Sequence, residues 1–355
     1  MKRHKPFSVN FRGQSILNQS NLISIDLAKN VFQVCGMTDR QSVVFNRQLK
    51  RKDLVAFMIN QAPVEVAMEA CYSSHYWGRH FEAMGHQVKL IPAQHVTPFV
   101  RGNKSDHNDA IAIGEAARRP NLIPVPIKTI EQSDIQCIHR MRERYVRDKT
   151  GLTNQTRGLL SEYGVIGATG HKAFSKLIRE VSAPEYEGLS PLLKDQLNSV
   201  ADEYCYQNLR IQEYNRILSE MAHQHPLCQI LLSIPGIGPI NATAIYSAIG
   251  NGAQFNSGRQ FAVWMGLTPR QSGSGDKFTS GGITKRGNRY LRKQLVHGAR
   301  AVLFRSKGKK DLLNRWAHAV AERRGVPKAS VALAARLARL AWTLMQKNTM
   351  YQSRF

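Results

Sequence analysis

The sequence has few acidic residues, few cysteines and no long hydrophobic run. Asp and Glu number 25 against 50 Lys and Arg in 355 residues, which gives a formal charge of +25. Such an excess is not required for folding and destabilises a compact chain by self-repulsion. It therefore favours a polyanionic partner, and nucleic acid is the first candidate. An apolar content of 42% excludes an intrinsically disordered chain.

The missing hydrophobic runs and the scattered cysteines narrow the class of protein further. No stretch approaches the roughly 18 apolar residues of a membrane span, so no membrane partner is expected. Residues 1–21 are basic and polar without the apolar core of a secretory signal, which predicts a flexible basic arm. The five cysteines form no C-x-x-C pair. A disulfide framework and a structural zinc site are therefore not expected, and a reducing cytoplasm fits best.

The block from residue 22 to residue 128 alternates strand and helix patterns. Strands are predicted at Leu22–Asp26, Val31–Met37, Val43–Leu49, Val64–Glu69 and Val88–Ile91, and helices at Lys52–Asn60, Ser74–Met84 and Asp106–Ala117. Short connections between the first three strands indicate an antiparallel meander, which parallel strands then extend. The first and fourth strands would be neighbours in this α/β sheet. Residues Asn121–Lys128 carry two prolines and are predicted to be a linker.

The rest of the chain is predicted to be mainly helical. Polar helical patterns at Ile130–Tyr163 and Leu192–Ala222, interrupted at Gly164–Gly170, indicate a paired-helix arm over residues 129–224. Residues 225–355 form a second helical block with a flexible Gly/Ser-rich loop at Ser272–Gly282. The fold class expected is therefore α/β followed by all-α.

Four carboxylates stand where this arrangement can gather them. Asp26 ends the first strand and Glu69 the fourth, while Asp106 and Asp109 lie three residues apart on one face of a helix start. Converging carboxylates repel one another without a divalent cation, and Mg²⁺ accepts such oxygen ligands while keeping waters for substrate phosphates. Two ions ~4 Å apart can clamp an in-line phosphoryl displacement. The alternative is that the strand-end acids are solvated and that the Asp pair only caps its helix and compensates the helix dipole.

A glycine-rich turn in the last block points to phosphate binding. Leu232–Ala242 contains Pro-Gly-Ile-Gly between two helical patterns. Gly236 and Gly238 permit a tight turn, and the next helix start offers unpaired amides to a phosphate, as in a helix-hairpin-helix motif. A plain glycine turn between two helices is the alternative.

The Gly/Ser-rich loop is bracketed by cations. These are Arg270, Lys277, Lys285, Arg286, Arg289 and Arg292. A serine among such cations can attack a phosphodiester whose charge they neutralise. A mobile linker that only contacts backbone phosphates is the alternative. No His–Asp pair nearby completes a hydrolase triad, so acyl transfer is not supported.

Together these segments resemble the DEDD transposases of insertion sequences, the group that is related to the Piv site-specific DNA invertase and described as bridge-RNA-guided recombinases. The matching segments span nearly the whole chain in the order of the family. They are Ile25–Lys29, Met68–Cys71, Lys104–Ala110, Ile234–Pro239, Gly266–Arg270 and Gly282–Gly287. Each segment alone is a weak signal, and the combination is specific.

The resemblance implies a ribonuclease-H-like (RuvC-like) domain at residues 22–128, a coiled-coil arm at 129–224 and a transposase domain at 225–355. It implies that Asp26, Glu69, Asp106 and Asp109 bind Mg²⁺, and that a serine forms a transient phosphoserine bond to DNA. The motif of the family gives this role to Ser274. Ser272 is a second candidate, because the usual adjacent serine pair reads Ser-Gly-Ser here.

The resemblance also implies the partners of the protein. These are donor and target DNA, a structured non-coding guide (bridge) RNA and further copies of the chain, as a dimer or tetramer on DNA. Sequence reading would then be delegated to base pairing. Two alternatives stay open. A hydrolytic, structure-specific nuclease resembling a Holliday-junction resolvase needs only the carboxylates, and a non-enzymatic nucleic-acid-binding protein needs only the glycine turn and the basic surface.

Overall fold

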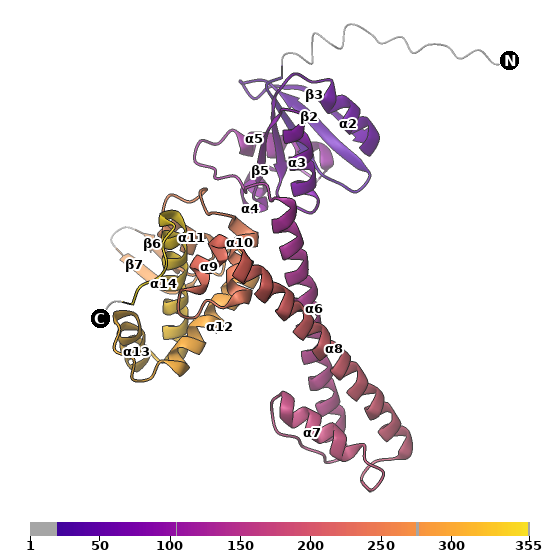
Figure 1. Ribbon diagram of the computed structural model, residues 1–355. Helices are drawn as coiled ribbons and strands as arrows, with labels where there is room; N and C mark the ends of the chain where they lie inside the picture. The colour runs from indigo at the N-terminus through magenta and orange to yellow at the C-terminus, as the bar shows by residue number, and fades with distance from the viewer. Residues whose placement is uncertain (1–19, 104, 275–276, 354–355) are drawn as a thin grey trace, which may run out of the picture. The chain divides into compact units, whose positions relative to one another are not determined.

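The computed structural model describes residues 20–103, 105–274 and 277–353. Of the predicted basic arm, residues 1–19 lie outside these ranges. The chain divides into two compact units, residues 1–129 and residues 130–355, and each has hydrophobic clusters of its own (Figure 1). Within the described ranges, none of the helices combines the length and the apolarity that a membrane crossing needs.

Unit 1 is built on a five-stranded sheet in the order β3-β2-β1-β4-β5. The strands are β1 (Leu22–Asp26), β2 (Val31–Met37), β3 (Val43–Lys50), β4 (Glu65–Glu69) and β5 (Gln87–Ile91). The first three form the predicted antiparallel meander, and β4 and β5 extend it in parallel. The prediction that the first and fourth strands are neighbours is confirmed, because Ile25 of β1 is paired with Met68 of β4.

Helices cover both faces of this sheet. The helices of unit 1 are α2 (Arg51–Ile59), α3 (Ser74–Ala83), α4 (Ala93–Val96) and α5 (Asp106–Ala117), with a 3-10 turn at Thr97–Phe99. Residues of α2 and α3 share a cluster with Ile23 and Ile25, whereas α5 shares the opposite cluster with Leu22. Side chains alternate along a strand, so Ser24 lies on the α5 face and donates to the Ala110 carbonyl at 2.6 Å. The same alternation puts the last residue of β1 on this face.

Residues 121–128 are not the linker that their prolines predict. The N–H of Val125 donates to the carbonyl of Leu90 at 2.8 Å and forms an isolated antiparallel bridge with β5. Lys128 is buried, and its carbonyl accepts a hydrogen bond from Arg79 at 2.6 Å. The prolines thus exclude a regular helix or strand here, but the segment stays packed on unit 1 and belongs to it.

In the residues that the structure describes, unit 2 is helical apart from one hairpin. Its helices are α6 (Ile130–Ser161), α7 (His171–Val181), α8 (Pro191–Gln224), α9 (Pro226–Leu232), α10 (Pro239–Ile249), α11 (Gly258–Trp264), α12 (Arg289–Arg305), α13 (Leu312–Arg324) and α14 (Val326–Lys347). Within this unit α6 and α8 run side by side, and α7 packs at their far end (Figure 1). The two long helices match the prediction of a helical pair. The predicted helices do not include α7, although Phe174, Ile178 and Val181 have helical spacing and are buried.

The prediction of a flexible loop at Ser272–Gly282 is wrong. The segment forms an antiparallel hairpin of β6 (Pro269–Ser274) and β7 (Lys277–Ile283), with Ser272 paired to Thr279. Glycine and serine have low strand propensity, but the partner strand carries Phe278 and Thr279. Gly275 and Asp276 lie outside the described residues, as do the side chains of Ser274, Lys277 and Phe278.

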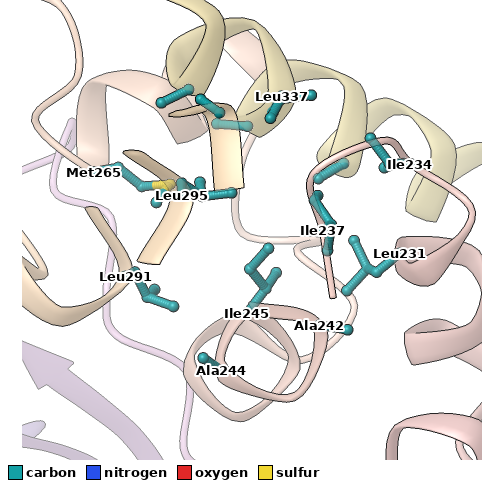
Figure 2. Packing of buried hydrophobic residues seen from close by; sticks show 14 of the residues in the cluster. Leu231, Ile234, Ile237, Ala242, Ala244, Ile245, Met265, Leu291, Leu295 and Leu337 are labelled. Atoms are coloured by element: carbon teal, nitrogen blue, oxygen red, sulfur yellow. The ribbon is translucent and has the colours of Figure 1, made fainter. Parts of the chain in front are cut away.

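The core of unit 2 lies beneath the turn between α9 and α10. Figure 2 shows Leu231, Ile234 and Ile237 around Ile245 of α10, with Leu337 of α14 close by. All five side chains are buried. The turn is therefore held by apolar contacts on its inner side.

Candidate active site and nucleic-acid interface

Asp26, Glu69, Asp106 and Asp109 lie on one face of the sheet of unit 1. Asp26 and Glu69 end the parallel neighbours β1 and β4, whose last paired residues directly precede them. The first turn of α5 carries the other two aspartates, and α5 packs on the same face. The structure thus brings together acids from three segments that are far apart in the sequence.

The four carboxylates act on one another electrostatically. Burial, and then the negative charges of Asp109, Asp106 and Glu69, raise the pKa of Asp26 to about 6. A hydrogen bond from the N–H of Leu27 offsets part of this rise. A concentration of hard oxygen donors with unfavourable mutual charge fits a divalent cation.

The side chains as they stand do not yet form a metal site. In the part of the chain that the structure describes, no group of three or more His, Cys, Asp or Glu residues is arranged so that it could hold a metal ion. The donor set therefore fits a divalent cation in chemistry and charge, although its side chains are not arranged around a common point.

The capping role of α5 belongs to Ser105. Its hydroxyl oxygen accepts a hydrogen bond from the N–H of Asn108 at 3.3 Å, and the Asn108 amide donates to the carbonyl of Asn103 at 2.8 Å. A serine at this position satisfies one of the unpaired N–H groups of the helix start. Neither Asp106 nor Asp109 is the cap, which weakens the capping part of the alternative explanation for this pair.

A relay of amide hydrogen bonds connects the sheet to the first turn of α5. Gln33, which is paired with Asp26 across β1 and β2, donates to the Asn46 side chain on β3 at 2.6 Å. The Asn46 amide in turn donates to the carbonyl of His107 at 3.0 Å. His107 lies between the two aspartates of the first turn, so the relay fixes their backbone. Gln33 and Asn46 are not among the predicted site residues, although they share one face of neighbouring strands.

The two glycines of the α9–α10 turn have different roles. Gly236 has φ +86°, and a Cβ there would lie 2.9 Å from the carbonyl oxygen of Gly298 on α12. A Cβ on Gly298 would lie only 2.0 Å from the carbonyl oxygen of Gly236. By contrast, a Cβ on Gly238 would meet nothing within 4 Å. Gly236 is therefore required for packing, and Gly238 leaves the amino end of α10 open.

A basic cavity of about 710 Å³ runs along this turn. Its lining combines the turn residues with His297, Arg305 and Lys309, and the described residues that line it include no carboxylate. Arg305 and Lys309 are exposed. Helix amides at the start of α10 and two exposed cations suit a phosphate group. The cations come from the end of α12 and the following loop, within the stretch Arg305–Lys310 whose composition predicts a basic surface loop that contacts phosphate. What the sequence does not reveal is that this loop lies beside the glycine turn.

Some of the predicted cations around the β6–β7 hairpin are exposed, and others form hydrogen bonds with backbone carbonyls. Lys285, Arg286 and Arg289 are exposed. Arg292 is half-buried, and its guanidinium donates to the carbonyls of Met265 at 3.0 Å and Arg286 at 3.2 Å. Arg292 thus stabilises the turn, whereas the exposed three present their charge to solvent.

The remaining predicted residues, Arg270, Ser272, Ser274 and Lys277, belong to the two strands of the hairpin. Arg270 donates to the Thr284 carbonyl at 3.5 Å. The Ser272 hydroxyl is exposed and hydrogen-bonded to the Thr279 hydroxyl at 2.8 Å. Ser274 is paired with Lys277 through the backbone. The hairpin therefore presents a serine-bearing strand on the surface of unit 2.

Comparison with known proteins identifies relatives along the full chain. A family model described as the transposase IS116/IS110/IS902 family matches residues 228–315, and a DEDD transposase model of the IS110 type matches residues 23–165. The chain is 43% identical over 331 residues to a probable family 20 transposase of Pseudomonas aeruginosa, covering 93% of this chain and 98% of that protein. It is 39% identical over 352 residues to the transposase for insertion sequence element IS1111A of Coxiella burnetii, covering 99% and 96%. A more distant similarity, 22% over 267 residues, links it to the pilin gene-inverting protein of Moraxella bovis, covering 71% and 73%.

Proposed function

Because the chain belongs to the IS116/IS110/IS902 transposase family, we propose that it cuts and rejoins DNA strands with the four carboxylates of unit 1 and a serine of the β6–β7 hairpin. Family membership makes the protein an insertion-sequence transposase that acts on DNA and uses a divalent metal. The observation that carries the finer proposal is the electrostatic coupling of Asp26 to Glu69, Asp106 and Asp109.

We infer that these four carboxylates hold Mg²⁺, whose bound form supplies positive charge beside the scissile phosphate. The residues of the chain orient the site. Ser105 caps α5, and the amide of Asn46 holds the backbone of its first turn. The strand order and the parallel β1–β4 pair support a ribonuclease-H-like, RuvC-like fold for unit 1.

The proposed chemistry conserves the phosphodiester. The hydroxyl of Ser274, with Ser272 as second candidate, attacks phosphorus; a serine O–P bond forms, the P–O bond to one deoxyribose breaks, and the serine proton ends on the departing hydroxyl. Attack by a DNA hydroxyl then reverses these changes on a new strand. The exposed Lys285, Arg286 and Arg289 support this role, because they can neutralise phosphate charge next to the hairpin.

The proposal includes further partners. We infer that the α9–α10 turn acts as a helix-hairpin-helix element, and its open Gly238 and basic cavity support contacts to backbone phosphates. The net charge of +25 supports a polyanionic partner, either DNA or a structured guide RNA. A dimer or tetramer on DNA, with the arm at residues 129–224 and the transposase domain at 225–355, completes the proposal.

Strand exchange on a supercoiled plasmid, with the RNA of the element present, tests this function. We expect Asp26→Asn and Ser274→Ala each to lower joined product at least about 100-fold, and wild-type protein to give a covalent protein–DNA species on a denaturing gel. Wild-type exchange by both Ser274→Ala and Ser272→Ala would exclude the serine mechanism. Cleavage by these serine variants without joined product would favour the hydrolytic nuclease instead.

A further inference from the structure

We propose that a pocket on the α2–α3 side of unit 1 binds an unpaired nucleotide of a single DNA strand. The pocket has a volume of about 600 Å³. Its lining comes from three places, the start of β2, the β3–α2 junction and α3, and consists of Asn30, Val31, Lys50, Arg51, Lys52, Val55, Tyr76 and Trp77. None of the four carboxylates lines it. The choice of DNA as occupant rests on the proposed function, whereas the nucleotide chemistry rests on the pocket.

The apolar part of the pocket presents an aromatic ring. Trp77 is fully buried in the core, whereas the neighbouring Tyr76 is 46% exposed. The Tyr76 ring is stacked on His80, with centroids 5.8 Å apart and 12° between planes, and it meets Trp77 edge-on at 5.2 Å. These contacts fix the orientation of a large exposed ring. Fixed, exposed aromatic rings are the surfaces on which single-stranded nucleic acids stack their bases.

The polar part of the pocket is made of cations. Lys50, Arg51 and Lys52 follow one another at the β3–α2 junction and are exposed. In the part of the chain that the structure describes, none of the three forms an ion pair with a carboxylate. The Arg51 guanidinium lies over the rings of Trp77 at 4.8 Å and Tyr76 at 5.4 Å, which holds it at the pocket. Cations beside an aromatic ring match a nucleotide, with its base on the ring and its phosphates on the charges.

The chemistry of the pocket decides between possible occupants. Uncompensated positive charge disfavours a cationic ligand or a basic peptide. A base inside a duplex is covered on both faces by its neighbours, so only an unpaired base reaches the ring. Recognition through one ring and backbone phosphates is tolerant of sequence, which suits a strand-processing enzyme.

The pocket lies at the same end of the sheet as the carboxylates. β1 and β4 end where β2 begins and β3 ends, because β2 is antiparallel to β1 and β3 to β2. Asn30 follows the end of β1 closely, and its carbonyl accepts a hydrogen bond from the N–H of Arg51 at 3.2 Å. The pocket is on the α2–α3 face and the carboxylates are on the α5 face. A strand that crosses this end of the sheet contacts both.

Fluorescence anisotropy of the full chain with a labelled 12-nucleotide DNA strand tests the pocket. We expect Tyr76→Ala to bind the single strand about tenfold more weakly and duplex DNA as wild type does, because only unpaired bases stack. Tyr76→Phe keeps the ring and should bind as wild type. Tyr163→Ala is the matched control, since Tyr163 is 54% exposed in unit 2 and does not line the pocket.

The charges are tested separately. Replacing both lysines, Lys50→Gln with Lys52→Gln, should weaken single-strand binding and lower the slope of log K against log salt by about 1.4, since each phosphate contact on a single strand contributes about 0.7. An unchanged slope would overturn the assignment of these lysines to phosphates.

Three outcomes would overturn the proposal. The first is that folded Tyr76→Ala binds the single DNA strand as tightly as wild type does. The second is that Tyr76→Ala loses as much affinity for duplex DNA as for the single strand. The third is that an RNA strand of the same sequence binds more tightly than the DNA strand and is the only one of the two whose binding depends on Tyr76. Circular dichroism establishes that each variant is folded. Asp26→Asn should keep full single-strand affinity while losing strand exchange. Single-strand affinity therefore tests the pocket, and strand exchange separately tests the proposed function.

Discussion

Asn46 is the residue through which the sheet holds the first turn of α5. Asn46→Ala removes its hydrogen bonds to Gln33 and to the His107 carbonyl. We expect a folded protein, less stable by about 1 kcal/mol, with affinity for Mn²⁺ lowered about tenfold, because groups that orient metal ligands have effects of this size. Calorimetric titration measures the affinity. Asn60→Ala is the control, since it loses a comparable bond, to the Ala56 carbonyl, within α2; equal Mn²⁺ affinity in both variants would contradict a positioning role for Asn46.

His139 makes unit 2 sensitive to acid. It is buried, with one ring nitrogen 3.0 Å from the Tyr290 hydroxyl and the other 3.0 Å from the Thr243 hydroxyl. Burial, and then the charge of Arg142, lower the pKa of His139 to about 4 from 6.5. As pH falls, the unfolded chain therefore binds a proton at this histidine before the folded chain does. The stability that the neutral His139 contributes is complete above pH 6.5 and is lost between pH 6.5 and about 4.

Urea unfolding at pH 7.5 and pH 4.5 measures this effect. We expect the free energy of unfolding of the wild type to fall by on the order of 2–3 kcal/mol more than that of His139→Gln, which cannot titrate. Parallel losses in the two proteins would show that His139 does not carry the pH dependence.

Among single residues, the sequence is sufficient to predict that the four acids converge. It is insufficient to predict the hydrogen bonds of the amide side chains. The convergence of Asp26 and Glu69 follows from strand ends and strand order, and Asp106 and Asp109 share a helix face by spacing alone. The contacts of Asn46 depend on the register of three strands, which periodicity does not reveal. The engagement of Arg292 by two carbonyls depends on a side-chain conformation in the folded protein.

Among the elements, α12 and the α9–α10 turn approach each other through two glycines. Gly298→Ala places a methyl group against the Gly236 carbonyl, and we expect a loss of stability of about 1–3 kcal/mol from overpacking. Gly238→Ala, where a Cβ has open space and φ is −92°, should cost less than about 1 kcal/mol. Chemical denaturation of the two variants measures the difference; equal losses would mean that the close approach does not limit packing.

The elements of unit 1 were predictable where burial imposes a pattern, and those of unit 2 less so. β1 and β2 are buried strands whose apolar runs are bounded by polar turns, so their bounds agree with the prediction. The β6–β7 hairpin is exposed and rich in Gly and Ser, so neither alternation nor propensity marks it. Residues 121–128 have the composition of a linker, but their backbone hydrogen bond to β5 is a tertiary feature.

For the whole molecule, the charge excess predicts the response of DNA binding to salt. With a net charge of +25, the chain can contact many phosphates and release their counterions. We expect the affinity for a duplex to fall at least about 1,000-fold between 50 and 200 mM salt, as for six or more phosphate contacts. Anisotropy over a salt series measures the slope. A slope that corresponds to only one or two contacts would mean that the excess charge serves another partner.

The length of α6 sets a lower limit on the number of base pairs that the protein protects when a DNA duplex runs along this helix. Near its start the Gln132 amide donates to the Tyr246 carbonyl of α10, and near its end Leu160 packs in the cluster that includes Phe174 of α7. The helix rises about 42 Å between Gln132 and Leu160, and a duplex rises about 3.4 Å per base pair. A straight duplex that runs along α6 and touches both places is therefore protected from nuclease digestion over at least about 12 base pairs, and removing α7 would shorten that protection from one side only.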